Sequence, residues 1–565
     1  MKNSRKTFIK NSIIVLLMTL ITAGSFSAFL TLTIDEPNVV VGYAAGREKS
    51  IPVFAKKEDG SFELTESIVR GTRIKYYADA EKEGDKQYYR LKDARNISGF
   101  ENGDAEEQDD VVYFVSDENL AKQKNAVVKE SEVYVRTPAT IYKDALGPAI
   151  ASFAPKGSRI KVSGYDKLLS DGSVNKYKVI NGEDEGFVYG KYLVSTQKAA
   201  DAVYNENGVY DNIKNDKYGM KLYAGQASDL DYYPRKRPAF KENEFCSNAR
   251  AMYINAAAAL NPKPYVKLIK DSGCNAVVID IKDGNLAYKS EVAEELSPRS
   301  YKHAYADEDE YKKGIDAYRK TGAYLIGRIV VFNDSVYAKD NPEECIKYKG
   351  ESGWPSVYSR KVWEYNVRLA LEAVDKFGFN EIQFDYVRFP ENAYEMSKSG
   401  KADFKNTYDE KKGQAVQNFC MYAADMLHEN GAYMSVDVFG ESAYGYMTAY
   451  GQYWPGISNV ADAISAMPYT DHMGADRSWE DPYSTMLSWS KRAKKQQDKI
   501  ENPAAARTWI TGYDTPHWNP TVIYGKGKLK AETRALEKAG LDGGFIPWNA
   551  ASDIEKYRQY KEVWN

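Results

Sequence analysis

Several features that mark common classes of protein are scarce or missing in this 565-residue sequence. It has only four cysteines, at positions 246, 274, 345 and 420, and none of them forms a CxxC pair. We therefore expect buried free thiols and no disulfide framework, although one bridge stays open as an alternative. The four histidines match no metal-ligand spacing, so we expect no metal and no other cofactor. No GxGxxG or GxxxxGK[ST] motif opens a predicted helix, which argues against nucleotide binding.

An excess of charge of one sign is also missing. The chain has 77 Lys and Arg side chains against 80 Asp and Glu. This balance gives no electrostatic reason to expect a nucleic-acid partner.

The first 45 residues predict an export segment. An uncharged stretch over 11–34, rich in Ile, Leu, Val and Phe, follows four basic residues: Lys2, Arg5, Lys6 and Lys10. The stretch exceeds the roughly 20 residues that span a bilayer, so a cleaved signal peptide and an uncleaved membrane anchor both remain open. Either alternative makes the protein exported, with residues 50–565 extracellular or at the cell surface.

Two related segments follow, at 50–125 and 131–196. The sequence Gly71-Thr-Arg-Ile-Lys75 recurs as Gly157-Ser-Arg-Ile-Lys161, and both segments consist of short alternating runs with Gly and Asp turns. This pattern predicts two small all-β barrels. The second segment, from SEVYVRTPATIY to GFVYGKYLV, resembles a bacterial SH3-like domain. The resemblance implies contact with cell-wall glycopeptide, and a simple spacer is the alternative.

Residues 197–219 are polar, lack apolar periodicity and predict a linker. Beyond them, apolar runs alternate with helical patterns over 220–565. The amphipathic patterns predict helices over 361–377, 410–430 and 529–540. Eight runs predict strands: 250–256, 275–283, 324–332, 381–390, 433–440, 462–470, 507–513 and 543–550. Eight strand–helix alternations indicate an α/β fold, a (β/α)8 TIM barrel.

Two aspartates in these runs are candidates for catalysis. Asp385 is the lone carboxylate inside the apolar run EIQFDYVRFP, where a buried charge is costly unless it serves a purpose. Asp437 lies in the next run, YMSVDVFG, and active sites of such barrels form at the C-terminal ends of the strands. Glycoside cleavage needs one ionised and one protonated carboxyl group. We predict Asp385 as nucleophile or base and Asp437 as acid, with Glu441 as the rival acid because of its spacing.

Other side chains at the predicted strand ends are candidates for binding substrate. They are Asp280, Lys282, Asp283, Arg328, Arg388, Tyr469, His472, Asp514, Trp548 and Asn549. Trp454 and Trp518 are further candidate platforms for sugar rings.

Structural roles are the alternatives for several of these residues. For three aspartates, capping a helix or ordering a loop is as well supported as a role at the site: Asp283, Asp334 and Asp514. Asp280 and Lys282 share a face of one strand, which favours an ion pair inside the barrel. Arg328 needs a carboxylate partner, either Asp385 or Asp280, unless it contacts substrate.

Six blocks of this region resemble, in order, the motifs of a bacterial family of glycoside-hydrolase-like proteins formerly catalogued as a domain of unknown function (DUF4015-like). They cover roughly 249–560 and are NAVVIDIKD, YLIGRIVVFND, EIQFDYVRFP, SVDVFG, ISAMPYTDHMG and GFIPWNA. The resemblance implies a TIM barrel. It places Asp385 where alpha-amylase-like glycosidases carry their nucleophile, and the Asp of the DVFG block falls on Asp437. Ala466 departs from the family pattern, which more often has proline there.

We therefore expect an exported glycoside hydrolase that acts on a cell-envelope or extracellular polysaccharide. A non-catalytic carbohydrate-binding or wall-attached protein with the same scaffold is the first alternative. A metal-dependent hydrolase is the second, and it needs two or more carboxylates or histidines within ligand distance.

Overall fold

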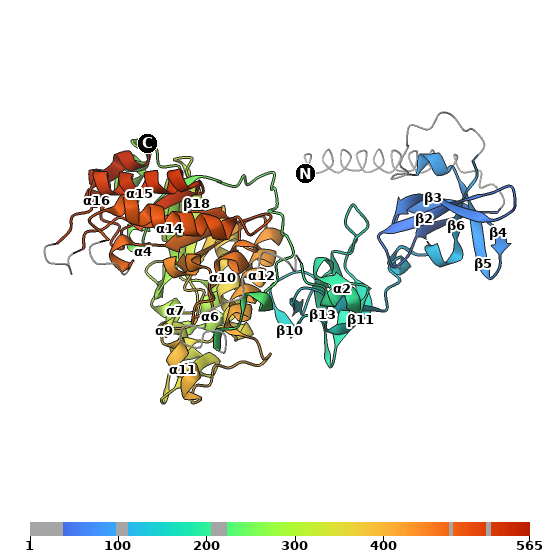
Figure 1. The fold of residues 1–565 in the computed structure, drawn as a ribbon, viewed down its shortest axis with the longest axis horizontal. Coiled ribbons are helices and arrows are strands. Elements are labelled where there is room, and N and C mark those ends of the chain that lie inside the picture. The colour runs from blue at the N-terminus through green and yellow to red at the C-terminus, as the bar shows by residue number, and fades with distance from the viewer. Residues whose placement is uncertain (1–37, 98–110, 205–222, 474–477, 516–520) are drawn as a thin grey trace, which may run out of the picture. The chain divides into compact units, whose positions relative to one another are not determined.

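A computed structural model of the chain describes residues 38–97, 111–204, 223–473, 478–515 and 521–565 (Figure 1). The chain divides into two compact units, Met1–Glu132 with Val162–Tyr177, and Val133–Lys161 with Lys178–Asn565. The apolar stretch of the predicted export segment lies outside the described residues. Within the described ranges, no helix is both long and apolar enough to cross a membrane.

The first third of the chain forms two antiparallel sheets. The first has the strand order β3-β2-β6-β5-β4-β1-β7, and its core contains Ile51, Val53, Ile74 and Val115. Its strands are β1 (Val39–Ala44), β2 (Ser50–Lys56), β3 (Phe62–Val69), β4 (Arg73–Glu83), β5 (Lys86–Lys92), β6 (Tyr113–Ser116) and β7 (Leu120–Ala121).

The second sheet repeats this arrangement, with the strand order β10-β9-β13-β12-β11-β8-β14. Its strands are β8 (Glu132–Val135), β9 (Ala139–Tyr142), β10 (Ile150–Ala154), β11 (Arg159–Tyr165), β12 (Lys176–Asn181), β13 (Asp184–Tyr189) and β14 (Leu193–Val194). In each sheet a single turn of 3-10 helix precedes the last strand, Asp117–Asn119 in one and Gly190–Tyr192 in the other. The shared order fits two SH3-like modules. The predicted linker begins with α2 (Gln197–Asp201), and its residues from 205 onward lie outside the described ranges.

The remaining chain forms a parallel barrel, as the sequence predicted. Its strands are β15 (Ala249–Ile254), β16 (Ala276–Asp283), β18 (Tyr324–Val330), β21 (Glu381–Asp385), β22 (Tyr433–Phe439), β23 (Ala463–Met467), β24 (Ala505–Ala506), β25 (Thr508–Thr511) and β26 (Gly544–Trp548). β24 pairs with β23 and β25 pairs with β26, so the two are parts of one seventh strand, interrupted at Arg507. This strand joins the two ends of the parallel series, and the (β/α)8 prediction is confirmed.

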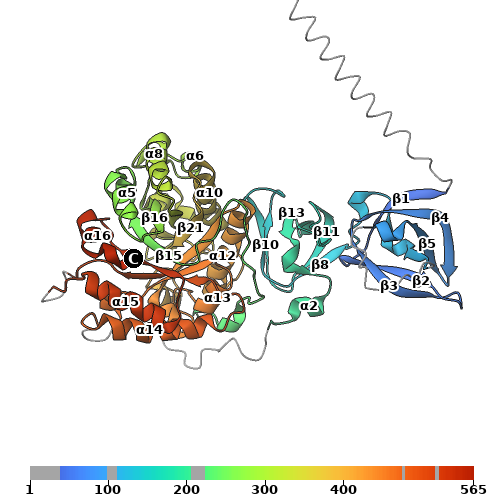
Figure 2. The ribbon, with the colours of Figure 1, turned by 90° about the horizontal axis from the view of Figure 1, so that it is seen from above.

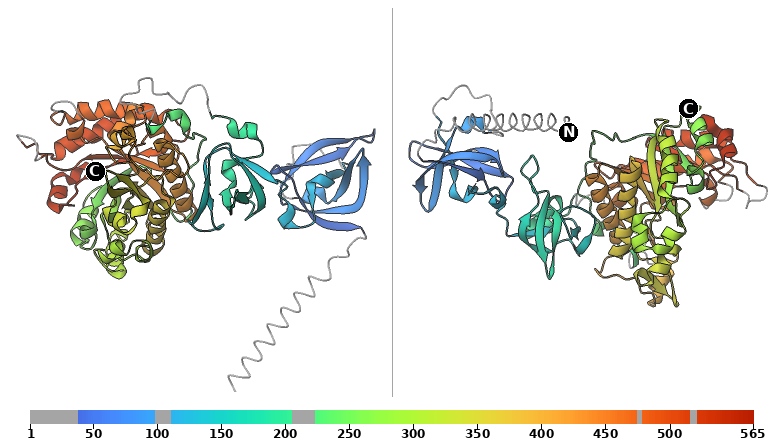
Figure 3. Two further views of the ribbon diagram at one scale, coloured as in Figure 1. Left: turned by 90° about the horizontal axis from the view of Figure 1, so that it is seen from below. Right: turned by 180° about the vertical axis from the view of Figure 1, so that it is seen from behind.

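Helices surround these strands (Figures 2 and 3). They are α4 (Ala256–Ala259), α5 (Lys263–Lys270), α6 (Glu291–Leu296), α7 (Pro298–Lys302), α8 (Glu308–Arg319), α9 (Ser335–Asp340), α10 (Arg360–Phe377), α11 (Ala393–Ser399), α12 (Lys412–Glu429), α13 (Trp454–Ser458), α14 (Pro482–Gln497), α15 (Lys526–Ala539) and α16 (Ile554–Tyr560). The three predicted helices correspond to α10, α12 and α15. In α10, Ser359 caps the first turn by accepting from the Val362 N–H, and Gly378 ends the helix at φ 63°.

A short strand and a hairpin are additions to the alternating strands and helices of the barrel. β17 (Asn285–Leu286) pairs antiparallel with the end of β16, and a hairpin of β19 (Cys345–Tyr348) and β20 (Glu351–Pro355) follows α9.

The barrel interior is charged at more than one level. Near the N-terminal ends of the strands, Arg507 Nη1 contacts Glu381 Oε1 at 2.6 Å, and both side chains are fully buried. A buried charge needs a partner of opposite sign, and this pair satisfies both groups. A second charged layer lies at the C-terminal ends of the strands.

Candidate active site

Asp385 is the last residue of β21, which is shorter than the predicted run 381–390. The next residue, Tyr386, takes a left-handed conformation with φ 54°, so the strand cannot continue. The Tyr386 N–H donates to Asp385 Oδ1 at 2.6 Å. Non-glycine residues in this conformation are strained and are common at functional sites.

Arg328, in the middle portion of β18, supplies the partner that the buried Asp385 needs. Its Nη2 donates to Asp385 Oδ2 at 2.6 Å and its Nη1 donates to Asp280 Oδ1 at 2.8 Å. A third carboxylate, Asp283, accepts from Nη1 at 3.2 Å. The guanidinium therefore holds three carboxylates around one buried positive charge.

Asp437 lies beside Asp385 on the neighbouring strand. The preceding residues, Phe384 and Val436, are paired in the parallel register of β21 and β22. The Trp509 indole N–H donates to Asp437 Oδ1 at 2.8 Å, while Oδ2 lies 3.9 Å from Arg328 Nε and has no hydrogen-bond partner among the described residues. Burial, followed by the charge of Asp385, raises the pKa of Asp437 well above its ordinary value. The raised pKa favours the protonated form of Asp437, and Asp437 lies beside the Asp385 side chain that Arg328 contacts.

Asp280 completes this layer. Its Oδ2 accepts from the Tyr253 hydroxyl at 2.5 Å. Burial raises the pKa of Asp280 to about 6, although the charge of Arg328 opposes the rise. Four carboxyl groups, those of Asp280, Asp283, Asp385 and Asp437, thus lie within 3.9 Å of the Arg328 guanidinium.

A cavity of about 230 Å3 opens above this layer. It is lined by Arg328, Asp385, Tyr386, Arg388, Phe439, Met467, Tyr469, His472, Trp509 and Trp548. Asp385 is the one carboxylate among these lining residues. Asp437 is 1% exposed and lies beneath the lining.

His472 stands at this cavity with a defined orientation. Its Nδ1 is 2.8 Å from Asp471 Oδ1, which also accepts from the Tyr513 hydroxyl at 2.7 Å. The hydrogen bond to Asp471 raises the pKa of His472. This pairing directs the other ring nitrogen away from Asp471.

Arg388 forms part of the cavity wall. Its Nη1 donates to the Phe389 carbonyl at 3.0 Å, and its guanidinium lies 4.5 Å from the centre of the Phe439 ring and 4.7 Å from that of Tyr386. Burial lowers the pKa of Arg388. These contacts with two aromatic rings hold the Arg388 guanidinium against the cavity wall.

The expected ion pair between Asp280 and Lys282 is wrong. The register between β16 and β18 shifts between these two residues, so they no longer face the same side. Lys282 Nζ instead donates to Asp334 Oδ2 at 2.7 Å and to Asn366 Oδ1 at 2.8 Å, outside the cavity lining. Asp334 also caps α9 by accepting from the Val336 and Tyr337 N–H groups, as its capping alternative predicted.

Other predicted residues also lie outside the cavity lining. Glu441 accepts from the hydroxyl groups of Tyr446 at 2.6 Å and Tyr450 at 2.5 Å. Asp514 accepts from Lys556 Nζ and the Tyr524 N–H, and orders its loop. Two candidates, Asn549 and Trp454, pair with neighbouring structure: Asn549 with the Asp553 backbone and Trp454 with Gln497. Trp518 lies outside the described residues.

Besides Asp385 and Asp437, the structure brings seven of the predicted residues together at this site. They are Arg328, Asp280, Asp283, Arg388, Tyr469, His472 and Trp548. Sequence reasoning did not single out Tyr253, Tyr386, Phe439, Met467 or Trp509. Trp509 lies two residues after Arg507 in the same predicted strand. Because alternate residues of a strand face the same side, this spacing indicates that both side chains point into the barrel.

In the portion of the chain that the structure describes, no group of three or more His, Cys, Asp or Glu side chains is arranged to hold a metal ion.

Comparison with known proteins adds a family and several distant structures. The model of a family described as "Putative glycosyl hydrolase domain" (DUF4015) matches residues 251–554. No curated protein matches the chain. A hypothetical protein from Ruminiclostridium thermocellum is 28% identical, with a TM-score of 0.28, over 33% of this chain and 97% of that one. The PgaB (BpsB) glycoside hydrolase domain from Bordetella bronchiseptica is 11% identical, with a TM-score of 0.41, over 56% and 99%. A beta-N-acetylhexosaminidase from Bacteroides fragilis is 12% identical, with a TM-score of 0.40, over 57% and 66%.

Proposed function

The chain belongs to the DUF4015 family of glycosyl hydrolase domains, and on this basis we propose that it hydrolyses glycosidic bonds of a polysaccharide. Family membership supports glycoside hydrolase activity. The observation that carries the proposal is the arrangement at the C-terminal ends of β21 and β22, where Asp385, which contacts Arg328, lies beside Asp437, whose pKa is raised by burial and by Asp385.

Asp385 is the reacting carboxylate in this proposal. It lines the cavity, where it is placed to attack the sugar or to activate water, and Arg328 Nη2 holds its Oδ2 at 2.6 Å. Trp548 and Tyr469, which also line the cavity, supply aromatic faces against which a sugar ring packs.

Asp437 is the proposed proton donor, because burial and the neighbouring Asp385 raise its pKa and so favour its protonated form. It lies under the cavity lining, so this role requires the departing oxygen to reach the floor of the cavity between Asp385 and Trp509. Glu441 remains the rival acid, and its two tyrosine hydroxyl groups hold it away from the lining.

We further propose that the protein is exported and acts on a polysaccharide of the cell envelope or outside the cell. The basic and then apolar residues at the start of the sequence support export. The two SH3-like modules support contact with cell-wall glycopeptide, and their alternative role is that of a spacer.

The experiment is product analysis with a panel of cell-wall and extracellular polysaccharides, scored for new reducing ends. Asp385→Asn is expected to lower the rate by about 10²–10⁴-fold or more, the usual cost of removing a positioned catalytic acid or base. Asp437→Asn is expected to lose activity to a similar extent, and Glu441→Gln, the control, is expected to keep it.

The outcomes separate the alternatives. Full activity of both Asp385→Asn and Asp437→Asn refutes the site. Loss in Glu441→Gln with activity kept in Asp437→Asn transfers the acid role to Glu441. Binding of a glycan by the wild-type protein without any release of reducing ends favours a non-catalytic carbohydrate-binding protein.

A further inference from the structure

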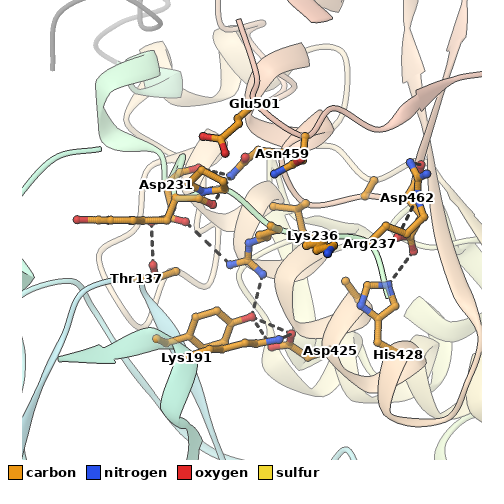
Figure 4. A pocket seen from close by; sticks show the side chains of 18 of the residues that line it. Thr137, Lys191, Asp231, Lys236, Arg237, Asp425, His428, Asn459, Asp462 and Glu501 are labelled. Atoms are coloured by element: carbon orange, nitrogen blue, oxygen red, sulfur yellow. Dashed lines mark hydrogen bonds and ion pairs between the residues drawn. The ribbon is translucent and has the colours of Figure 1, made fainter. Parts of the chain in front are cut away.

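A second cavity, of about 590 Å3, is drawn in Figure 4 with most of the side chains that line it. Several of these side chains precede β23 and β24, so the cavity lies at the opposite end of the barrel from Asp385, which ends β21. Its wall combines the segment 231–237, the end of α12, the loops that precede β23 and β24, and residues of the second SH3-like module. Its volume is in the range of about 300–1,000 Å3 that is typical of ligand sites. None of the roles proposed above uses it.

Carboxylates form the buried floor of this second cavity. Asp425 accepts from the Tyr192 hydroxyl at 2.6 Å and from Lys191 Nζ at 2.6 Å. Asp462 accepts from the Met434 N–H at 2.8 Å and lies 2.7 Å from His428 Nε2. The side chains of both carboxylates are at most 4% exposed. The negative charges of Asp425 and Asp462 are therefore already matched by fixed donors. Asp231, also in the lining, accepts from the Thr137 hydroxyl at 2.9 Å through Oδ1, and its Oδ2 has no hydrogen-bond partner among the described residues.

Cationic groups, by contrast, face the solvent side of the cavity. The side chains of Lys191 and Arg237 are 52% and 32% exposed, although each lies near one of the floor carboxylates. Lys236 is exposed and has no ion-pair partner among the described residues. Figure 4 shows Lys236 and Arg237 on the same side of the cavity.

Two arginines of the lining add positive charge, and no carboxylate of the described residues lies within hydrogen-bond distance of either. Arg235 Nη1 donates to the Tyr192 hydroxyl at 2.8 Å, and its nearest carboxylate, Asp231, is 4.0 Å away. Arg136 donates to the Lys191 carbonyl at 2.7 Å and stacks 4.0 Å from the centre of the Tyr233 ring. Within the described part of the chain, the Nε–H groups of both arginines have no hydrogen-bond partner.

We propose that the second cavity binds an anionic glycan, a sugar chain that carries carboxylate or phosphate groups. Arg136, Arg235 and Lys236 bind the anionic groups, since guanidinium and ammonium groups are the usual partners of both. The Tyr233 ring and the amide of Asn502 in the same lining suit the sugar itself. The choice of a glycan over other anions rests on the proposed hydrolase function.

Such a site is a secondary one. It holds the polymer at the N-terminal end of the barrel strands, while cleavage takes place at the C-terminal end. Its loss therefore weakens attachment to a long charged substrate and leaves the cleavage of a short neutral one unchanged.

Binding is tested with full-length Asp385→Asn protein, so that the probes stay intact. The probes are oligogalacturonate, neutral cellohexaose and inorganic phosphate, each measured by calorimetry. Lys236→Glu is expected to weaken oligogalacturonate binding by about tenfold, the effect of losing one charge-assisted hydrogen bond. Arg235→Gln provides a second variant that removes charge and keeps a donor for Tyr192. Lys270→Glu, an exposed lysine on α5, is the matched control and is expected to leave binding unchanged.

Four results overturn the proposal. They are equal binding of cellohexaose and oligogalacturonate, unchanged binding in both Lys236→Glu and Arg235→Gln, binding of phosphate alone as tightly as of the oligosaccharide, and absence of all binding. Because the assay measures binding and not cleavage, failure of the hydrolase proposal leaves a separate signature, an inactive wild-type protein on every glycan.

Discussion

Arg328 is the residue on which the charged layer of the barrel depends, and its replacement by methionine is the most informative perturbation. Methionine has a similar length and no charge, so it fills the space without creating a large void. It leaves Asp280 and Asp385 without the guanidinium that now contacts them at 2.8 and 2.6 Å. Removing one partner of a buried ion pair costs about 3–5 kcal/mol, and we expect that loss at neutral pH.

The loss should depend on pH. The pKa of Asp280 is already about 6, and Arg328 opposes its rise, so the pKa rises further in Arg328→Met. A carboxyl group with a raised folded-state pKa contributes stability that is complete below its unfolded-state pKa and is lost as the pH rises through the folded-state value. The difference between variant and wild type should therefore be small at pH 4 and largest above pH 7.

Urea unfolding followed by tryptophan fluorescence measures this difference. All nine tryptophans lie between Trp354 and Trp564, so the signal reports on the barrel. Arg328→Lys, which keeps a positive charge but loses the forked donor, is the control and should lose less stability. An Arg328→Met protein as stable as the wild type at pH 7.5, or equally destabilised at pH 4 and pH 7.5, would refute this account of the layer.

Three further predictions concern single groups. Trp509→Phe removes the hydrogen bond that lowers the pKa of Asp437, so that pKa should rise and kcat/KM should fall about tenfold, which a pH–rate profile measures. Burial raises the pKa of Glu532 from 4.5 to about 8, so the wild type should lose roughly 5 kcal/mol of stability as the pH rises from 4.5 to 8, whereas Glu532→Gln should not. Melting temperatures of both proteins at pH 5 and pH 9 test this, and an equal change in melting temperature for the two would contradict the prediction. The hydrogen bond to Asp471 raises the pKa of His472 in the wild type, so Asp471→Asn should lower that pKa. An NMR titration that shows the same pKa in both proteins would contradict this.

The barrel was predictable because each strand is a short apolar run and because helices such as α10 and α15 carry an apolar face. The same periodicity located α10, α12 and α15 within a few residues. The seventh strand, split at Arg507, still appeared as one apolar run, RTWITGY. The periodicity of apolar residues is a property of the local sequence, so it predicts strands and helices without knowledge of tertiary contacts.

The site was predictable only in part. Asp385 stood out because a lone carboxylate in an apolar run needs a partner, and Arg328 stood out for the same reason. The ion pair predicted between Asp280 and Lys282 is wrong because a register shift within β16 changes the direction of the Lys282 side chain. No local sequence pattern predicts such a bulge. Trp509 was missed because an aromatic side chain in a strand is equally expected in an ordinary core.

The central claim, that Asp385 is the carboxylate that acts on the glycosidic bond, is tested most directly by chemical rescue. Asp385→Ala is assayed for sugar release on a glycan that the wild type cleaves, with and without sodium azide. The account predicts loss of release without azide and recovery when azide takes the place of the missing carboxylate. Sugar release at the wild-type rate without azide would contradict it.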